Sequence, residues 1–194
     1  MEFSYAIEKV FRDVLPKLPH GNDGLIFTCR MSPYTFGTDQ KILKWKPAEE
    51  NSVDFLLTLG FRTIPPEELD SDDEADSDAG PVFDYDAKPT FGLSCYYGDS
   101  NYEEWGEMHV TDGEWEELKA LGQPLDEEIV ECRMDEQKRW KFMRLRKDKK
   151  EANHISTVES VIESIRDAVG QDDLIRSYSE IREAWKKRNA IPSR

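Results

Sequence analysis

The 194-residue sequence predicts an α+β fold, with a β-rich central part between an N-terminal segment and C-terminal helices. Two kinds of observation lead to this prediction. Apolar residues recur at helical spacing near the N-terminus and again after residue 156. Between these segments, short runs rich in β-branched and aromatic residues alternate with turn-forming residues, which is typical of strands.

The first fifty residues are predicted to form one helix and two strands. Ser4 is expected to cap the helix, which ends before Pro16. The strands are expected at 24–28 and 41–46, each preceded by a turn. One helix and two strands do not enclose a core, so we interpret residues 1–50 as the C-terminal part of a larger domain.

Residues 51–194 are predicted to form a second domain. Its strands are expected at 53–60, 90–97, 106–110, 129–133 and 140–146. A helix with Trp115, Leu118 and Leu121 on its inner face follows the third strand. About five strands, one helix and long connections favour a small OB-fold β-barrel.

Two C-terminal helices are predicted after the barrel, at 156–169 and 173–189. Ser156 and Glu159 match a capping box, and Gly170 is placed to end the first helix. Apolar residues at helical spacing on both helices indicate faces that pack against the rest of the protein.

Charge is segregated along the chain, whose formal net charge is −15. The stretch from Glu67 to Asp78 holds eight acidic and no basic residues, so 67–80 is predicted to be a disordered insert. Nine basic residues lie between Arg133 and Lys150. A focused polyphosphate site is therefore compatible with the sequence, whereas non-specific coating of nucleic acid is not.

The remaining composition excludes several kinds of site. The three cysteines are far apart, which favours free thiols in a reducing compartment, and the three histidines are too scattered for a zinc site. No apolar run approaches the length of a membrane span or a signal segment. The sequence thus predicts a soluble intracellular protein without a membrane partner.

Two short basic runs carry the strongest chemical signal. Lys44 and Lys46 are separated by one residue on a predicted strand, so both ammonium groups point to one face and can hold a phosphate. By the same parity, Arg144 and Arg146 share a face opposite Met143 and Leu145, and Asp148 continues that face. The alternative interpretation of the second run is an edge strand whose charges prevent aggregation.

These runs resemble motifs of a known family. The segments Asp23-Gly24-Leu25-Ile26-Phe27, Leu43-Lys44-Trp45-Lys46-Pro47 and Arg144-x-Arg146-x-Asp148-Lys149 resemble motifs IV, V and VI of the mRNA capping enzymes. These are eukaryotic GTP:RNA guanylyltransferases of the covalent nucleotidyltransferase superfamily, and the flanking residues 18–22, 51–55 and 153–156 resemble the fungal type. The resemblance implies the C-terminal part of a nucleotidyltransferase domain followed by an OB-fold domain.

The resemblance also implies the chemistry. In this family a lysine in a K-x-D-G motif attacks the α-phosphate of GTP, and the GMP then passes to the 5′-diphosphate end of RNA with the help of Mg²⁺ or Mn²⁺. Asp23 would lie near the metal and the α-phosphate, which Lys44 and Lys46 would grip. The β- and γ-phosphates would be oriented by Arg144, Arg146, Asp148 and Lys149. Asp54 matches an acidic position that follows motif V.

One departure limits this expectation, because K-x-D-G occurs nowhere in the 194 residues. We therefore expect this chain to be the C-terminal half of a capping enzyme and, by itself, to form no covalent intermediate. The family implies a nuclear protein whose partners are nascent mRNA, the RNA polymerase II C-terminal tail and an RNA triphosphatase subunit. The alternative is a non-catalytic OB-fold interaction module that docks RNA polymerase II, an elongation factor or an RNA triphosphatase.

Overall fold

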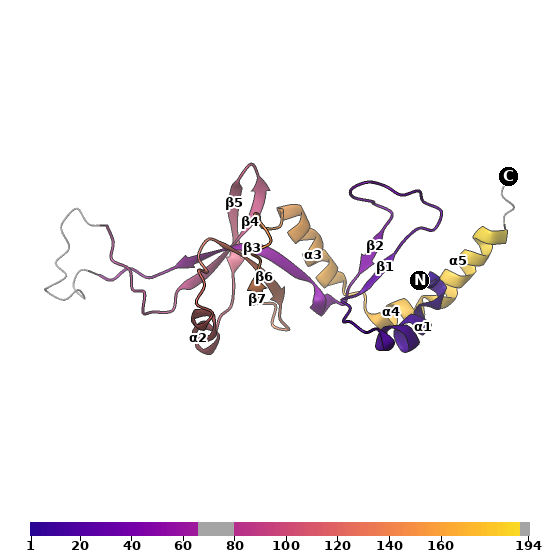
Figure 1. The fold of residues 1–194 in the computed structure, drawn as a ribbon, viewed down its shortest axis with the longest axis horizontal. Helices are drawn as coiled ribbons and strands as arrows, with labels where there is room; N and C mark the ends of the chain where they lie inside the picture. Colours follow the sequence, from indigo (N-terminus) through magenta and orange to yellow (C-terminus); the bar gives the residue numbers. More distant parts are fainter. Residues whose placement is uncertain (66–79, 191–194) are drawn as a thin grey trace. The chain divides into compact units, whose positions relative to one another are not determined.

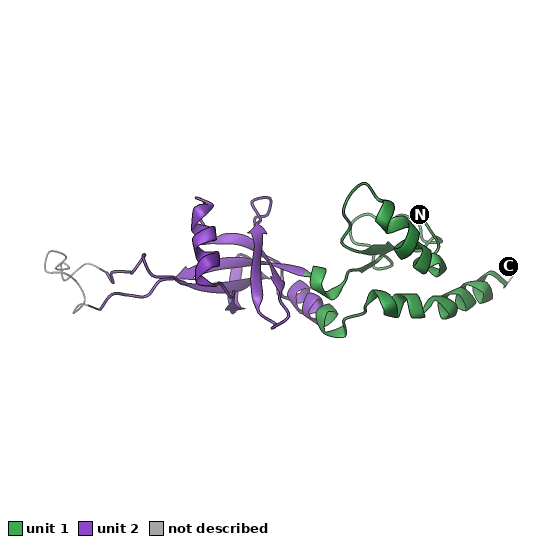
Figure 2. Cartoon of the chain, turned by 90° about the horizontal axis from the view of Figure 1, so that it is seen from below, with its two compact units in different colours: residues 1–51, 163–194 green, residues 52–162 purple. Residues whose placement is uncertain are grey.

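A computed structural model describes residues 1–65 and 80–190 of the protein. Backbone contacts divide the chain into two compact units, Met1–Asn51 with Glu163–Arg194 and Ser52–Ile162 (Figure 2). The predicted insert at 67–80 lies outside the described residues except for Gly80, which is exposed. None of the helices described is long and apolar enough to cross a membrane.

The second unit is built on one antiparallel sheet with the strand order β5-β4-β3-β6-β7 (Figure 1). The strands are β3 (Ser52–Gly60), β4 (Thr90–Gly98), β5 (Asn101–Glu107), β6 (Glu128–Met134) and β7 (Trp140–Leu145). Four of them lie where the sequence predicts them. The prediction at 106–110 was wrong, because this strand begins earlier, at Asn101. A tight turn joins it to β4, and in that turn Asp99 and Ser100 adopt positive φ.

The core of this unit follows strand alternation. Val53, Phe55 and Leu57 on β3 are at most 1% exposed, and they pack with Leu93, Cys95, Val130 and Cys132 from the neighbouring strands. Beyond the end of β5, Met108 forms a parallel bridge with Trp140, and the backbone N–H of His109 donates to the carbonyl of Trp140 over 2.8 Å. This bridge connects the two strands that stand at opposite ends of the sheet order.

Helix α2 (Asp112–Ala120) covers part of this core. Thr111 and Glu114 form its capping box, and Trp115 and Leu118 are buried as predicted. Leu121 was wrongly assigned to the inner face: it is 47% exposed, because the helix ends at Ala120 and the chain turns away.

Helix α3 (Ile155–Asp167) begins and ends differently from the prediction at 156–169. Ser156 lies inside the helix, so the predicted capping box was wrong. Instead, the imidazole Nδ1 of His154 accepts a hydrogen bond from the backbone N–H of Ser156 over 3.3 Å. At the other end Ala168 adopts a φ of 44°, which terminates the helix before Gly170.

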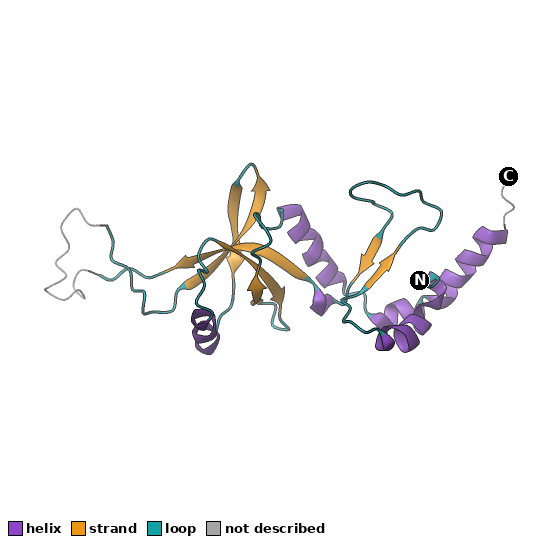
Figure 3. Ribbon diagram, viewed as in Figure 1, coloured by secondary structure: helices purple, strands orange, loops and turns teal. Residues whose placement is uncertain are grey.

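The first unit joins the two ends of the chain. Irregular helical turns run over η1 (Ser4–Ala6), α1 (Ile7–Lys9), η2 (Val10–Val14) and η3 (Leu15–Lys17), and η4 (Ala48–Glu50) follows later. The predicted cap at Ser4 was wrong, because Phe3 is the N-cap residue and supplies no side-chain hydrogen bond. The strands β1 (Leu25–Phe27) and β2 (Leu43–Trp45) pair with each other in antiparallel fashion (Figure 3).

The C-terminal part of this unit contains two helices, α4 (Gln171–Arg176) and α5 (Tyr178–Ala190), where one was predicted at 173–189. The break falls at Ser177, whose hydroxyl donates to the carbonyl of Asp173 over 3.0 Å. Trp185 of α5 lies 5.0 Å from the ring of Tyr5 and 6.0 Å from that of Phe3. Aromatic packing thus joins residues near the two ends of the chain.

Candidate functional site

The first candidate cluster lies on the β1–β2 hairpin and consists of Asp23, Lys44 and Lys46; we call it the lysine pair. Lys46 Nζ lies 2.5 Å from a carboxylate oxygen of Asp23. The pKa of Asp23 is lowered, chiefly by the hydrogen bond from Lys46 and also by the charge of Lys44. Asp23 therefore interacts with both lysines, whose common face the strand parity predicts.

Gly24 brings Asp23 to this position. Its φ is +154°, and a Cβ on Gly24 would lie 2.0 Å from the carbonyl oxygen of Trp45. No other residue allows this approach of the two strands, so glycine is required after Asp23.

Trp45 anchors the opposite face of β2. Its indole N–H donates to the carbonyl of Val169 over 2.7 Å, and its ring lies edge-on to Phe11 at 5.5 Å. Trp45 is thus held on both sides, which fixes the strand between the two lysines. Lys44 itself forms no side-chain ion pair or hydrogen bond within the described part of the chain.

The second candidate cluster spans three neighbouring strands of the sheet. We call it the arginine cluster, and its members are Asp54, Glu131, Arg144, Arg146, Asp148 and Lys149. The register pairs Asp54 of β3 with Glu131 of β6, and Glu131 with Arg144 of β7. Side chains on directly paired residues point to the same face, so these three form a row across the sheet.

Arg146 is the centre of this cluster. Its Nη1 lies 2.9 Å from Oδ1 of Asp54, and its Nε and Nη2 donate to the two carboxylate oxygens of Asp148 over 2.9 and 2.8 Å. Lys149 Nζ forms a further ion pair with Asp54. The Arg146 side chain is only 15% exposed, so it is a packed group held by carboxylates rather than a solvated edge charge.

Glu131 holds the two arginines together. Its carboxylate accepts from Arg144 Nε over 2.7 Å and from the Ser52 hydroxyl over 2.5 Å, and it lies 3.5 Å from Arg146 Nη1. Burial by itself would raise the pKa of Glu131, but the hydrogen bonds from Ser52 and Arg144 reverse this and lower it. Glu131 therefore stays ionised beside the guanidinium groups at neutral pH.

The exposed partner of Arg146 also has a shifted pKa. The hydrogen bonds from Arg146 lower the pKa of Asp148 to about 2. In turn the pKa of Arg146 is raised, first of all by Asp148 and also by the charge of Asp54. Arg144 differs, because its side chain is 65% exposed and only its Nε is used by Glu131. Among the described residues its Nη groups have no hydrogen-bond partner, so they can donate to a ligand.

The parity argument for β7 holds for the arginines but fails for the apolar residues. Leu145 packs against the core, whereas Met143 is 44% exposed. The reason is a β-bulge at Glu131/Cys132, which shifts the pairing of β7 by one residue. The two arginines still meet, because both contact the same carboxylate.

Asp23, Lys44 and Lys46 therefore lie together in the first unit, and Asp54, Arg144, Arg146, Asp148 and Lys149 lie together in the second. Sequence reasoning missed Glu131, although a carboxylate inside the apolar run 129–132 is a signal for a paired buried charge. Within the described ranges, no three His, Cys, Asp or Glu residues converge as a metal site.

Comparison with known proteins points to a single family. Residues 1–48 match the family model described as the catalytic domain of mRNA capping enzyme, and residues 50–175 match that of its C-terminal domain. Proteins named mRNA-capping enzyme subunit alpha from Schizosaccharomyces pombe and Yarrowia lipolytica are 48% and 47% identical over 97% and 99% of this chain. The Saccharomyces cerevisiae protein of that name is 38% identical over 98%. The chain spans 43%, 46% and 46% of these relatives, or about half their length.

Proposed function

Because the chain belongs to the mRNA capping enzyme family, we propose that it carries the phosphate-binding groups of a GTP:RNA guanylyltransferase. The observation that carries this proposal is that both basic clusters are preorganised. Carboxylates hold Lys46 and Arg146 in place. Lys44 and the Nη groups of Arg144 have no side-chain partner in the part of the chain that the structure describes, so they can donate to a ligand. Such fixed cations are suited to the charge that develops during phosphoryl transfer.

We assign the residues in two groups. Lys44 and Lys46 bind the α-phosphate, where GMP changes partners. Arg144, Arg146 and Lys149 bind the β- and γ-phosphates and orient the departing pyrophosphate, with Asp148 holding the fork of Arg146. Asp54 positions Arg146 and Glu131 positions Arg144, each through a hydrogen bond to the guanidinium group.

GTP is the proposed nucleotide, with Mg²⁺ or Mn²⁺ as the metal. Asp23 is the carboxylate that forms an ion pair with Lys46 and whose pKa both lysines lower. Mg²⁺ is commonly bound by one or two carboxylates together with substrate phosphates, so the single Asp23 fits a metal that the nucleotide helps to hold. Bound there, the metal would neutralise charge on the phosphates.

We further propose that residues 1–50 complete a nucleotidyltransferase domain and that residues 51–194 form an OB-fold domain with C-terminal helices. The last part of that domain, Glu163–Arg194, has its contacts mainly with the first unit. Two features support the OB assignment. The order of elements in the second unit is three strands, α2 and two further strands, and the Met108–Trp140 bridge is parallel and joins the third of these strands to the fifth. A contact between these two edge strands is what a partly open five-stranded barrel would need, so it supports the assignment.

The family also defines the proposed setting. The relatives are named subunit alpha, which supports a second subunit, and we propose an RNA triphosphatase in that role. The acceptor would be the 5′-diphosphate end of nascent mRNA in the nucleus, with the RNA polymerase II C-terminal tail as docking partner.

A chimera tests the proposal. Residues 1–194 replace the matching part of the S. pombe relative, which is 48% identical, and the product is incubated with labelled GTP, Mg²⁺ and diphosphate-ended RNA. We expect a covalent protein–GMP adduct and capped RNA, both lost on Lys44→Ala but not on Lys41→Ala, an exposed lysine outside the cluster. A chimera that folds and binds RNA but never forms the adduct would favour the non-catalytic interaction module.

A further inference from the structure

A separate cavity of about 430 Å³ lies in the second unit, away from the arginine cluster. It is bordered by the segment that enters β4, the segment that leaves β5 and the turn before β7. Its charged lining residues are Lys88, Glu107, Lys138 and Arg139, together with His109. Three cationic side chains and one carboxylate thus line the cavity, and the proposed catalytic residues do not contribute to it.

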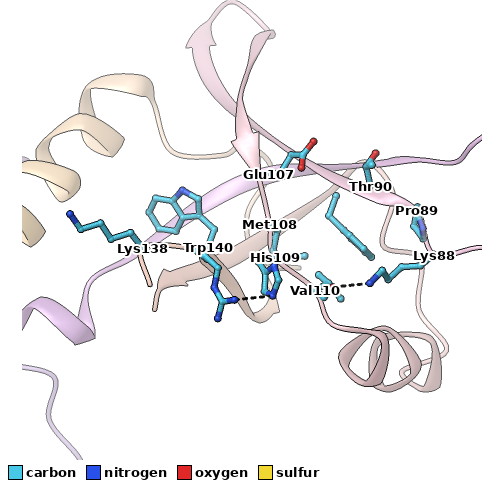
Figure 4. Close-up of a pocket in the computed structure, with 11 residues that line it drawn as sticks. Lys88, Pro89, Thr90, Glu107, Met108, His109, Val110, Lys138 and Trp140 are labelled. Carbon is cyan, nitrogen blue, oxygen red and sulfur yellow. Dashed lines mark hydrogen bonds between the residues drawn. The ribbon is translucent and has the colours of Figure 1, made fainter. Parts of the chain in front are cut away.

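Its cations are spread along the cavity. In Figure 4, Lys88 and Lys138 lie at opposite ends, with His109 and Trp140 between them. Lys88 donates to the carbonyl of Val110 over 3.2 Å and pairs with Asp112, and Arg139 pairs with Asp135 and lies 3.2 Å from His109 Nε2. Lys138 forms no side-chain ion pair among the residues the structure describes. Separated cations suit a chain of phosphates better than a single anion.

The position of the cavity also points to a nucleic acid. In OB folds, oligonucleotides bind over the second and third strands and the loops before the second and fifth. The corresponding connections here are β3–β4, which supplies Lys88, and β6–β7, which supplies Lys138 and Arg139.

We propose that this cavity binds the phosphate backbone of single-stranded RNA, independently of the nucleotide site. The identity of the polyanion rests on the proposed function, in which RNA is the acceptor. The rings of Phe91 and Trp140 in the lining are 4% and 7% exposed, so they offer no face on which a base can stack. The imidazole of His109 is exposed, but stacking of a base on it would not depend on the base sequence. Recognition therefore runs through phosphates and does not depend on base sequence.

RNA binding by the 194-residue chain tests this directly, without GTP. A fluorescent 12-mer oligouridylate with a 5′-hydroxyl end is titrated at several salt concentrations. Lys138→Gln should weaken binding several-fold and reduce the slope of log K against log salt by about 0.7, the value for one phosphate contact on a single strand. Glu107→Gln should strengthen binding, because it removes the one carboxylate that lines the cavity.

Lys119→Gln is the matched control. It removes one charge from the same unit, but Lys119 pairs with Glu116 on α2 and does not line the cavity. Equal effects of Lys138→Gln and Lys119→Gln would overturn the proposal, as would the absence of RNA binding at low salt.

Two further measurements locate the site and identify the ligand. On adding the oligomer to the wild-type chain, backbone amide NMR signals of residues 88, 90–91, 107–110 and 138–140 should shift, whereas shifts confined to 144–149 would overturn the assignment. Oligoadenylate should bind as tightly as oligouridylate, and millimolar pyrophosphate should not displace either. Displacement by pyrophosphate would identify a small-anion site instead. Loss of GMP transfer in the chimera leaves all of these readouts unchanged, so the two proposals fail separately.

Discussion

Arg146 donates to both carboxylate oxygens of Asp54, over 2.9 and 3.2 Å, although 92 residues separate them in the sequence. Asp54 is 4% exposed, so water hardly reaches its carboxylate. The charge is instead compensated by the ion pairs with Arg146 and Lys149. The same guanidinium is the proposed ligand of the β- and γ-phosphates. Arg146 therefore ties the end of β7 to β3 and also presents charge to a substrate, and substitutions at this position test both roles.

Arg146→Gln should destabilise the second unit. It leaves the buried Asp54 with Lys149 alone, and breaking a buried ion pair typically costs about 3 kcal/mol in the free energy of unfolding. Asp54→Asn in the same chain should recover part of this loss, because no buried charge then remains unpaired. Urea unfolding of both single variants and the double variant measures the coupling. Arg133→Gln, at an exposed position on β6, is the control, and strictly additive losses would contradict the pairing.

Acid should destabilise the protein through depressed carboxylate pKa values. The hydrogen bond from Lys141, together with Thr111, lowers the pKa of Glu114 from 4.5 to about 2. A carboxyl with a lower pKa in the folded state contributes stability above its unfolded pKa and loses it as the pH falls through the folded value. Thermal unfolding midpoints should thus fall between pH 4.5 and 2.

The matched variant for this effect is Glu114→Gln. It should be less stable than the wild type at pH 6 and should lose less on acidification. If the two midpoints fall in parallel between pH 5 and 2, Glu114 is not a source of the pH dependence.

The 194-residue chain should not become labelled by GTP, because it contains no K-x-D-G lysine to attack the α-phosphate. Incubation with radiolabelled GTP and Mg²⁺ or Mn²⁺ should leave no labelled band on a denaturing gel, whereas the chimera described above should give one. A band from the chain alone that is stable to alkali and labile to acid, as a phosphoramidate is, would refute the prediction.

The two clusters should act at different stages in the chimera. Lys44→Ala should impair both adduct formation and transfer to RNA, because the α-phosphate takes part in both. Arg146→Ala should slow adduct formation about a hundredfold, the equivalent of one charge-assisted contact of about 3 kcal/mol, while leaving transfer from a preformed adduct appreciable.

Arg144→Ala distinguishes an effect on phosphate binding from an effect on folding. Arg144 is 65% exposed, and Glu131 keeps its hydrogen bond from Ser52 in this variant. The measurement is single-turnover transfer of GMP from the purified adduct to RNA. If Arg146→Ala or Arg144→Ala slows this transfer as much as it slows adduct formation, β7 does not face the leaving pyrophosphate.

Local patterns in the sequence determined the existence of most elements and the position of the charged runs. Period-two alternation located β3, β4, β6 and β7, and helical spacing located α2 and α3. The parity of Lys44 and Lys46 predicted that both ammonium groups share one face of the strand, since only neighbours along one strand are involved. The pairing of β1 with β2 then brings Asp23 to them. The motif spacing also pointed to the family that the comparisons show.

Only the tertiary structure decided which distant residues meet. Glu131 joins Ser52 to Arg144, and Asp54 joins Arg146, because of the register of β3, β6 and β7. Strand periodicity says which face a side chain takes but not which residue lies opposite, and a bulge at Glu131/Cys132 changes even the face. Likewise, the cavity beside the Met108–Trp140 bridge depends on contacts between segments far apart in the chain. Such contacts are selected by the packing of the whole unit, which no local window of sequence contains.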